Sequence, residues 1–515
     1  MFARLLTMAA AFAALLIPAI LVVERLDADT LQLVLVVAST FALGAAGVLM
    51  MLEGIRALRR GRRGEAPLPG RPAPPARQAA PAQYGAPTRP AVPTRAPEKD
   101  TSARKPIGAV VVEGFASRLA FGLLSFALPL YAHSLGMTVA EIGLLLSTNM
   151  AVAVVLKPAM GALIDRIGVR TAYVAAVLLR TAVLVTLVLA SGPAHLFLAR
   201  GLHGVSIALR DPASSTVLSA LGGKKAIAQR FAWFQTVKSV AGSVGQFSAG
   251  VMLSILIGNY TAVFTLAALL SALPLVAVLA GLRGPVVDGL RLPRPERGTP
   301  MPADLRRALL PYAGLGALMT GTAYLMANLL PVLAVEYMGL APAAAASMYL
   351  VKSVVSLTGP LWGWIADRVS VRLVLGVRAL GNALSSLIWL VFPNYPGLIA
   401  GRVADDLGKA AFSPAWGSVM ARVSAMDPPR RSRTLALLSS AEDAGEMAGP
   451  VVAGVIWTTF GLPALLIFRA VAAVGTEVYA LVVSRRFDTA AQETATDAAP
   501  VVPSSPVDCV VKFPH

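Results

Sequence analysis

Apolar runs of roughly 20 residues recur along most of the chain, separated by short polar turns. A helix of that length crosses about 30 Å of hydrocarbon, and a backbone in lipid must form its own hydrogen bonds. The runs therefore predict membrane helices. From residue 107 onward they form two groups of six, at 107–133, 139–164, 171–191, 194–221, 227–257 and 260–282, then at 308–337, 342–367, 371–392, 396–424, 433–459 and 462–485.

The segments outside this core differ in character. Residues 5–23 and 31–52 are two further apolar runs joined by a short acidic turn. A cleaved signal peptide is the alternative for the first run, but it lacks a clear small-x-small cleavage site. We therefore predict an all-α membrane protein with 14 membrane helices and six regions: a transmembrane hairpin (1–52), a Pro/Ala/Arg-rich cytoplasmic linker (53–106), two six-helix bundles (107–282 and 308–485), a cytoplasmic central loop (283–307) and a disordered cytoplasmic tail (486–515).

Charge supports this topology. Only 14% of the residues are charged, against about 25% in soluble domains, and the formal net charge is +18. Lys and Arg concentrate in the loops predicted inside, whereas Arg25 is the only one in a predicted outside turn, as the positive-inside rule requires. The basic charge thus reflects a lipid bilayer partner and not nucleic acid, and both termini are predicted to be cytoplasmic.

Composition narrows the setting further. The Ala-, Arg- and Gly-heavy usage is typical of a GC-rich bacterial genome, so we expect a bacterial cytoplasmic membrane and a monomer. A single cysteine, Cys509, excludes a disulfide framework and a thiolate metal cluster. We expect no cofactor and no metal.

The two six-helix groups repeat each other. Gly161 and Gly363 lie 202 positions apart (363 − 161 = 202). The same offset relates further pairs: Asp165 and Asp367, Arg166 and Arg368, Arg170 and Arg372, Arg200 and Arg402, and the prolines 129 and 331, 158 and 360, and 212 and 414. Proline is disfavoured inside helices, so its repetition at one offset indicates duplication. Paired halves with a binding site between them are typical of secondary transporters.

The duplicated loop carries a family resemblance. The segment from Gly161 through Asp165 and Arg166 to Arg170 resembles the signature loop of the major facilitator superfamily, and the segment from Gly363 through Asp367 and Arg368 to Arg372 resembles its echo, with Ser370 in place of Gly168. The resemblance implies a twelve-helix transporter and a conformational latch that forms and breaks as the halves rock.

Two further segments resemble family motifs. Arg200 lies in a segment similar to the fourth-helix arginine motif, which the family links to proton coupling, although His203 replaces the usual glutamine; plain structural pairing is the alternative. The small-residue stripe from Ala241 to Gly250 loosely matches the antiporter motif but lacks its proline, and helix packing is its alternative.

Ionisable residues inside membrane spans are costly unless paired or hydrated, so each is a functional candidate. Glu442 and Glu446 share a helix face and Asp443 adjoins them, a crowded carboxylate set suited to binding protons. Because Glu442 nearly matches Lys238 in the repeat, we expect an ion pair between them across the halves. The full candidate set is Arg118, Lys157, Arg200, Arg210, Asp211, Lys238, Lys352, Asp405, Asp406, Glu442, Asp443 and Glu446.

Enzyme motifs such as a P-loop, a nucleophile elbow or His-Glu-x-x-His are absent from the sequence, so we do not expect an enzyme. We predict a secondary transporter of a small molecule, preferably a proton-coupled exporter of drug or metabolite type, driven by a proton gradient. The basic first half favours uptake of an organic anion as the alternative. A non-transporting receptor or scaffold of the same fold is the third hypothesis.

Overall fold

The computed structural model describes residues 104–220, 227–283, 290, 302–368, 371–425 and 431–497, and the regular structure within these ranges is helical. The first half contains α3 (Arg104–Ser134), α4 (Val139–Ile167), α5 (Val169–Val188), α6 (Pro193–Ala220), α7 (Ile227–Ile255), α8 (Tyr260–Leu270) and α9 (Ala272–Gly281). The second half contains α11 (Ala303–Ala327), α12 (Leu330–Val332), the π-helix η1 (Leu333–Tyr337), α13 (Pro342–Ser356), α14 (Gly359–Arg368), α15 (Val371–Val391), α16 (Tyr395–Ala425) and α17 (Arg431–Asp497).

These helices coincide with the spans predicted from 107 to 485, with local breaks. The span 260–282 divides at Ser271, and the span 342–367 divides between α13 and α14. The last two predicted spans are one merged element, α17, which turns at Gly461 with φ 85°. Glycine permits this left-handed conformation without a steric penalty.

The predicted boundaries fail at two places. The tail expected to be disordered from residue 486 instead continues α17 to Asp497, because its Ala, Gln and Glu residues favour helix. Helix α11 begins at Ala303, inside the predicted central loop. The N-terminal hairpin, residues 1–103 as a whole and residues 498–515 lie outside the described residues.

Six helical stretches within the described residues are long and apolar enough to cross a membrane: 106–134, 139–167, 169–188, 260–281, 303–337 and 433–483. Helices α6 and α16 are not among them. Helix α16 carries the buried charged residues Arg402, Asp405 and Asp406, and α6 carries the buried Arg210. The charges are therefore enclosed by the helix bundle, as charges inside a membrane must be.

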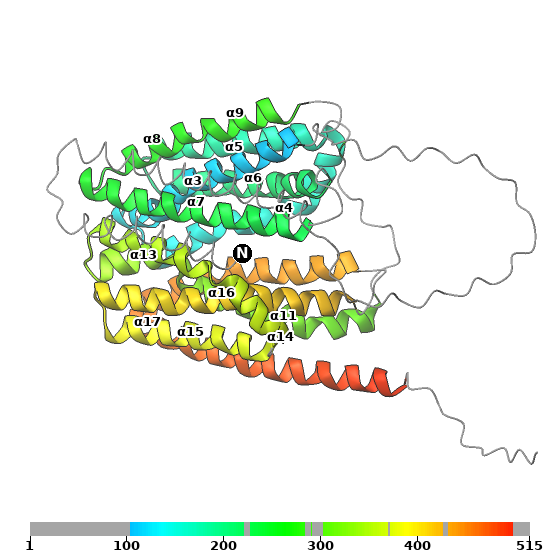
Figure 1. Cartoon of the computed structure of the whole chain (residues 1–515). Coiled ribbons are helices and arrows are strands. Elements are labelled where there is room, and N and C mark those ends of the chain that lie inside the picture. Colours follow the sequence, from blue (N-terminus) through cyan, green and yellow to red (C-terminus); the bar gives the residue numbers. More distant parts are fainter. Residues whose placement is uncertain are drawn as a thin grey trace, which may run out of the picture.

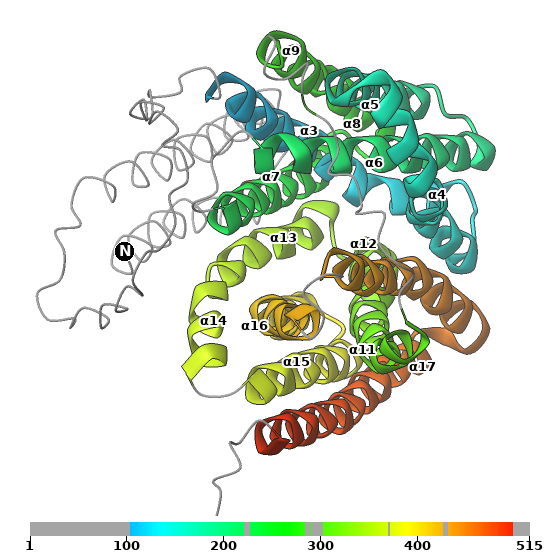
Figure 2. The ribbon, with the colours of Figure 1, turned by 90° about the vertical axis from the view of Figure 1, so that its right-hand side faces the viewer.

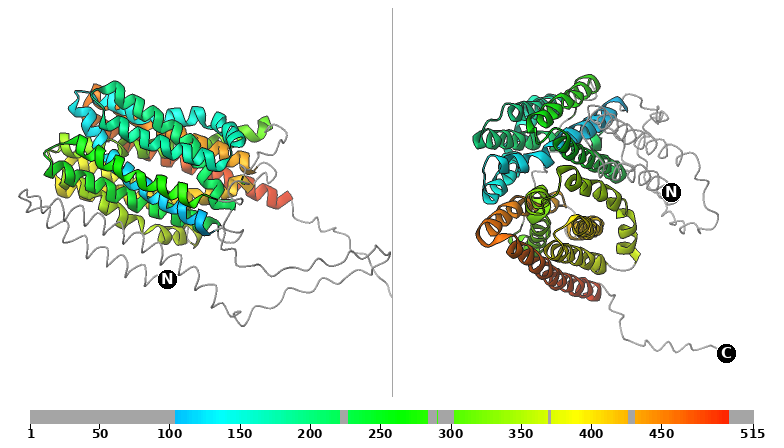
Figure 3. Two further views of the ribbon diagram at one scale, coloured as in Figure 1. Left: turned by 90° about the horizontal axis from the view of Figure 1, so that it is seen from above. Right: turned by 90° about the vertical axis from the view of Figure 1, so that its left-hand side faces the viewer.

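The two halves lie side by side, and the axes of their helices are roughly aligned with one another (Figure 1, Figure 3). Viewed along the helices, α7 faces α13 and α4 faces the first part of α17 (Figure 2). The C-termini of α4, α9 and α14 and the N-terminus of α17 lie at one end of the molecule (Figure 1), which we call the basic end because these termini carry Arg166, Arg283, Arg368 and Arg433. The other end is called the opposite end.

Glycines bring the halves into contact toward the opposite end. A Cβ added at Gly143 of α4 would lie 2.2 Å from the carbonyl oxygen of Pro450, and one at Gly250 of α7 would lie 2.5 Å from that of Pro342. The contacts continue through hydrogen bonds from the Ala140 amide to Thr458 Oγ1 (3.0 Å) and from the Ala343 amide to the Ser254 hydroxyl (2.9 Å). The structure is therefore closed at the opposite end.

Candidate transport site

A buried ion network joins three helices of the first half. Glu113 of α3 is fully buried, and its carboxylate accepts hydrogen bonds from Arg210 Nε (2.8 Å) and Nη2 (2.6 Å) of α6. The Tyr173 hydroxyl of α5 donates to the same carboxylate at 2.7 Å. A bidentate Arg–carboxylate pair is among the strongest polar contacts in a low-dielectric interior. Arg210, one of the predicted site residues, thus ties α6 to α3, and its part in a transport site stays a prediction.

Arg180 of α5 extends this network toward the centre of the first half. Its guanidinium donates to the Ser117 hydroxyl (3.0 Å), contacts His203 Nε2 at 3.3 Å and lies 4.5 Å from the Phe121 ring centroid. The rings of Phe121 and His203 are themselves 4.4 Å apart. The histidine that departs from the family pattern is therefore part of a packed arginine–aromatic cluster.

The second half has its own network, centred on α16. Asp405 accepts from Arg469 Nη2 (2.5 Å) and from Lys409 Nζ (2.6 Å), and Arg469 also donates to Asn382 Oδ1 (2.9 Å). One turn away, Arg402 Nε donates to Asp406 (2.6 Å). These contacts bury Asp405 and Asp406 among fixed cationic partners, so both acids stabilise the bundle.

The two networks follow the internal repeat. Arg180 and Asn382 are 202 positions apart, as are His203 and Asp405. In each half the pair lies between neighbouring helices, α5 and α6 or α15 and α16. The chemistry of the paired positions has diverged while their place in the fold has been kept.

Two ion pairs among the described residues cross between the halves: His133 Nδ1 of α3 lies 3.6 Å from Glu336 Oε2 of η1, an ion pair only when the histidine is protonated, and the other joins two charged side chains nearer the middle. Lys157 Nζ of α4 contacts Asp443 Oδ2 of α17, and both side chains are partly buried. The predicted partners were wrong: we expected Lys238 with Glu442, but across the interface α7 packs mainly on α13, whereas α17 packs on α4. Lys238 instead lies 5.0 Å from the Phe234 ring of its own helix.

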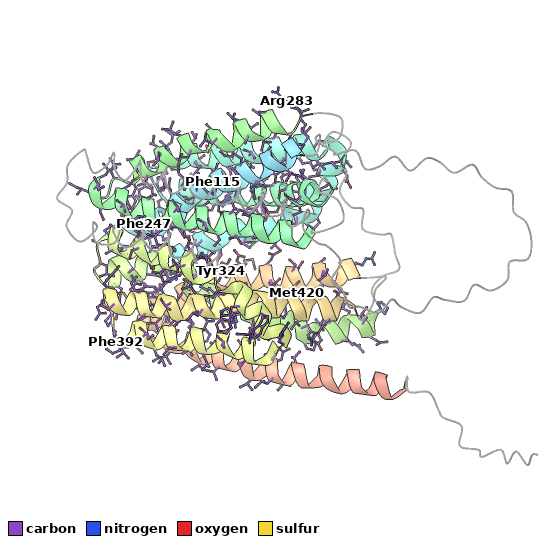
Figure 4. The ribbon with its side chains drawn as sticks, in the orientation of Figure 1. Phe115, Phe247, Arg283, Tyr324, Phe392 and Met420 are labelled. Atoms are coloured by element: carbon purple, nitrogen blue, oxygen red, sulfur yellow. The ribbon has the colours of Figure 1, made fainter. Side chains whose placement is uncertain are left out.

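The remaining carboxylates lie near this pair. Glu446, one turn beyond Asp443, hydrogen-bonds with Tyr324 of α11, which lies where the two halves face each other (Figure 4). Arg118 of α3 is close enough to Glu446 for their charges to interact across the halves. Glu442 is half-buried on the same helix. The centre of the interface thus carries both cations and carboxylates.

The duplicated loops lie at the basic end. Asp165 and Arg166 are exposed at the end of α4, and the chain then turns at Gly168 with φ 86°. In the echo, the Arg368 guanidinium lies 5.6 Å from the Trp364 ring centroid. The side chains of Asp367 and Arg372 are outside the described set. The latch role of the eight loop residues stays a prediction.

Two motifs have packing contacts. Arg200 donates to the carbonyls of Leu145 (3.3 Å) and Leu146 (2.5 Å) and to Asn149 Oδ1, all on α4. The small-residue stripe brings α7 against α3, since a Cβ at Gly245 would lie 2.2 Å from the Leu119 carbonyl oxygen. Both motifs therefore pack helices together, whatever further part they play in coupling.

Sequence reasoning missed several of these residues. Glu113 is not among the predicted candidates, although it is the centre of the first network. Arg180 and Arg469 are also absent from the predicted set. Their position deep inside predicted spans was the signal that could have identified them. No group of three or more metal-ligating side chains occurs among the described residues.

The sequence matches a known family over most of the helical core. The family model of the Major Facilitator Superfamily matches residues 113–359 and 317–508. A multidrug resistance protein B homolog from two strains of Mycobacterium tuberculosis is 30% identical over 102 residues, 20% of this chain and 18% of the relative. The chain thus aligns with less than a fifth of that curated relative.

Solved structures share the fold at low identity. A POT family transporter in complex with a thioalcohol-conjugated peptide has a TM-score of 0.61 at 16% identity, covering 74% of this chain and 96% of that one. The nucleoside transporter NupG has a TM-score of 0.60 at 15% identity, with 73% and 99% covered. The human organic anion transporter MFSD10 has a TM-score of 0.52 at 18% identity, with 73% and 99% covered. The chain is a multi-pass membrane protein and belongs to the Major Facilitator Superfamily, a family of transporters.

Proposed function

We propose that this chain is a proton-coupled secondary transporter that exports a small organic molecule by alternating access. The observation that carries the proposal is the Lys157–Asp443 ion pair, which joins the halves beside two further carboxylates. A carboxylate that pairs with a cation across a moving interface can exchange that partner for a proton. Proton binding and rocking of the halves are then linked.

The orientation follows from charge. By the positive-inside rule, the basic end faces the cytoplasm. The halves touch at the opposite end, so this conformation is inward-facing. The exposed Asp165 fits a latch that is disengaged in this conformation. An exporter would load its substrate from this state.

Transport proceeds by exchange at the centre. In the outward-open state a proton from outside would neutralise Asp443, and after the halves rock inward that proton would be released to the cytoplasm as Asp443 pairs with Lys157. Substrate loaded from the basic end would then be carried outward as the halves rock back, so that proton entry drives export. Glu446, which hydrogen-bonds with Tyr324, is a second carboxylate near the Lys157–Asp443 pair that can accept a proton. Export is favoured over uptake by the partial likeness to a multidrug resistance protein homolog.

The test is proton flux in proteoliposomes that hold the purified chain. Adding ethidium or benzoate on the side of the basic end should collapse an imposed pH gradient, and Asp443→Asn should abolish this flux. Asp304→Asn, an exposed acid in the first turn of α11, is the matched control and should behave as wild type. Flux that persists in Asp443→Asn would refute the coupling role.

Uptake of an organic anion is the second candidate. It is favoured by three cations near the interface, Arg118, Lys238 and Lys352, for which no carboxylate among the described residues lies within ion-pair distance. The two candidates are distinguished by the direction of the pH gradient that makes the substrate accumulate inside the proteoliposomes.

A further inference from the structure

We infer that Arg118, Lys238 and Lys352 together form a binding site for a carboxylate or phosphate group of the transported molecule. This inference rests on the proposed transport function and specifies its substrate class. The three residues come from α3, α7 and α13, so they belong to both halves of the molecule. We call them the cation triad.

The first two members lie side by side. The stem of Arg118 lies against Gly242 of α7, where an added Cβ would be 3.5 Å from Arg118 Cγ. Lys238 is four residues before Gly242 and therefore lies on the same helix face, about one turn or 5–6 Å toward the basic end. The stem of Arg118 therefore packs on α7 about one helical turn from Lys238.

The third member reaches the same level from the other half. Gly250 of α7 abuts Ala346 of α13. Helices α7 and α13 run in opposite directions, so both displacements from that contact point toward the basic end. Gly242 is eight residues back along α7, about 12 Å, and Lys352 is six residues forward along α13, about 9 Å. Lys352 therefore lies within about 3 Å of the depth of Gly242 and Arg118. The charge of Arg118 acts on both lysines.

None of the three triad residues has a carboxylate within ion-pair distance among the described residues. Arg118 is exposed although it sits in the middle of α3, and both lysines are partly accessible. The nearby acids have other partners: Asp406 is paired with Arg402, Asp211 with Arg210 and Asp443 with Lys157, and Glu446, whose charge also reaches Arg118, hydrogen-bonds with Tyr324. Three like charges at one level of a membrane protein are unfavourable without a counter-ion.

An anionic group supplies that counter-ion and couples binding to movement. Without it, Lys352 of the second half and Arg118 of the first half repel each other, as do Arg118 and Lys238. With it, the same three residues can converge on one carboxylate or phosphate, as charge-assisted hydrogen bonds favour. Binding would therefore draw α13 toward α3 and α7.

The experiment measures thermal stabilisation of the full chain in detergent by acetate, succinate, benzoate and inorganic phosphate, with tetraethylammonium and sodium chloride at equal ionic strength as references. A ligand that binds only the folded state raises the midpoint with concentration. We expect at least one anion to stabilise the protein. The relative effects of succinate, benzoate and phosphate identify the group.

Variants assign the effect to the triad. Lys352→Gln and Lys238→Gln should each weaken apparent affinity for that anion about tenfold or more, since a charged hydrogen bond contributes at least that much. Lys352→Arg keeps the positive charge and should retain anion binding, which would show that a loss in Lys352→Gln comes from the lost charge and not from replacement of the side chain. Arg307→Gln, an exposed cation of α11, should bind like wild type. The inference is overturned if no anion exceeds sodium chloride, or if Lys352→Gln and Lys238→Gln both respond as wild type.

Failure here is separable from failure of the proposed function. Proton flux driven by ethidium but by no anion would retain proton-coupled transport and reject the anion site. Anion binding that depends on the triad, in a protein without substrate-driven proton flux, would retain the site and reject the coupling.

Discussion

Replacement of Glu113 by glutamine should destabilise the first half strongly. The carboxylate is fully buried and accepts two hydrogen bonds from Arg210, at 2.8 and 2.6 Å, and one from Tyr173 at 2.7 Å. The side-chain amide of the replacement would offer one oxygen and place its own N–H donors against the guanidinium donors. Arg210, 3% exposed, would then keep a buried charge with only Asp211 as counter-charge.

The magnitude follows from the cost of breaking a buried pair on one side, about 3–5 kcal/mol of unfolding free energy. Asp211→Asn is the matched control because Asp211 contacts the same guanidinium at 3.3 Å but has a 54% exposed side chain. An exposed pair contributes about 1 kcal/mol or less. Glu113→Gln should therefore cost several times more than Asp211→Asn.

The assay is reversible unfolding of the detergent-solubilised chain, with helicity as the readout. The double variant Glu113→Gln with Arg210→Met should recover much of the loss, because it removes the unpaired charge along with its partner. If Glu113→Gln costs no more than Asp211→Asn, the network does not hold the half together, and our reasoning is refuted.

Three further outcomes are expected. Gly143→Leu should force α4 away from Pro450, because the Pro450 carbonyl oxygen would lie 2.2 Å from the added Cβ. In a Cys509→Ser background, this variant should raise the labelling rate of a cysteine placed at the opposite end. The control Gly201→Leu, which has open space at its Cβ, should leave that rate unchanged. Lys157→Asp and Asp443→Lys should each abolish proton flux, whereas their combination should restore part of it by reversing the ion pair; a dead double variant with wild-type helicity would count against the pair. Asp165→Asn should lose turnover and keep its melting temperature, and wild-type transport by this variant would exclude the latch.

The helical architecture was accessible from the sequence because hydrocarbon thickness imposes a length on each span. The repeat at 202 positions indicated the pairing of the halves, and Pro158 and Asp165 marked its register. The break at Ser271 was not predictable from hydropathy, because the residues on both sides are equally apolar. The extension of α17 to Asp497 was missed because polar composition was given more weight than helix propensity.

The site was harder to predict because side-chain partners depend on which helices pack together. Lys157 was a candidate, but its pairing with Asp443 required knowing that α4 packs on α17. Arg210 was placed at the binding site on charge alone, whereas it pairs with Glu113 inside the first half. A charged residue inside a predicted membrane span thus indicates that it has a polar partner, but the sequence does not identify that partner.

The measurement that tests the central claim most directly is the distance between spin labels across the halves at both ends of the molecule. Cysteine pairs would be placed at Ala140 and Thr458 for the opposite end, and at Ile167 and Ala436 for the basic end, in the Cys509→Ser background. Alternating access predicts two populations whose distances change reciprocally between pH 5.5 and 8 or on adding ligand: the opposite end opens as the basic end closes. A single unchanged distance at both ends under every condition would contradict transport and indicate a static scaffold.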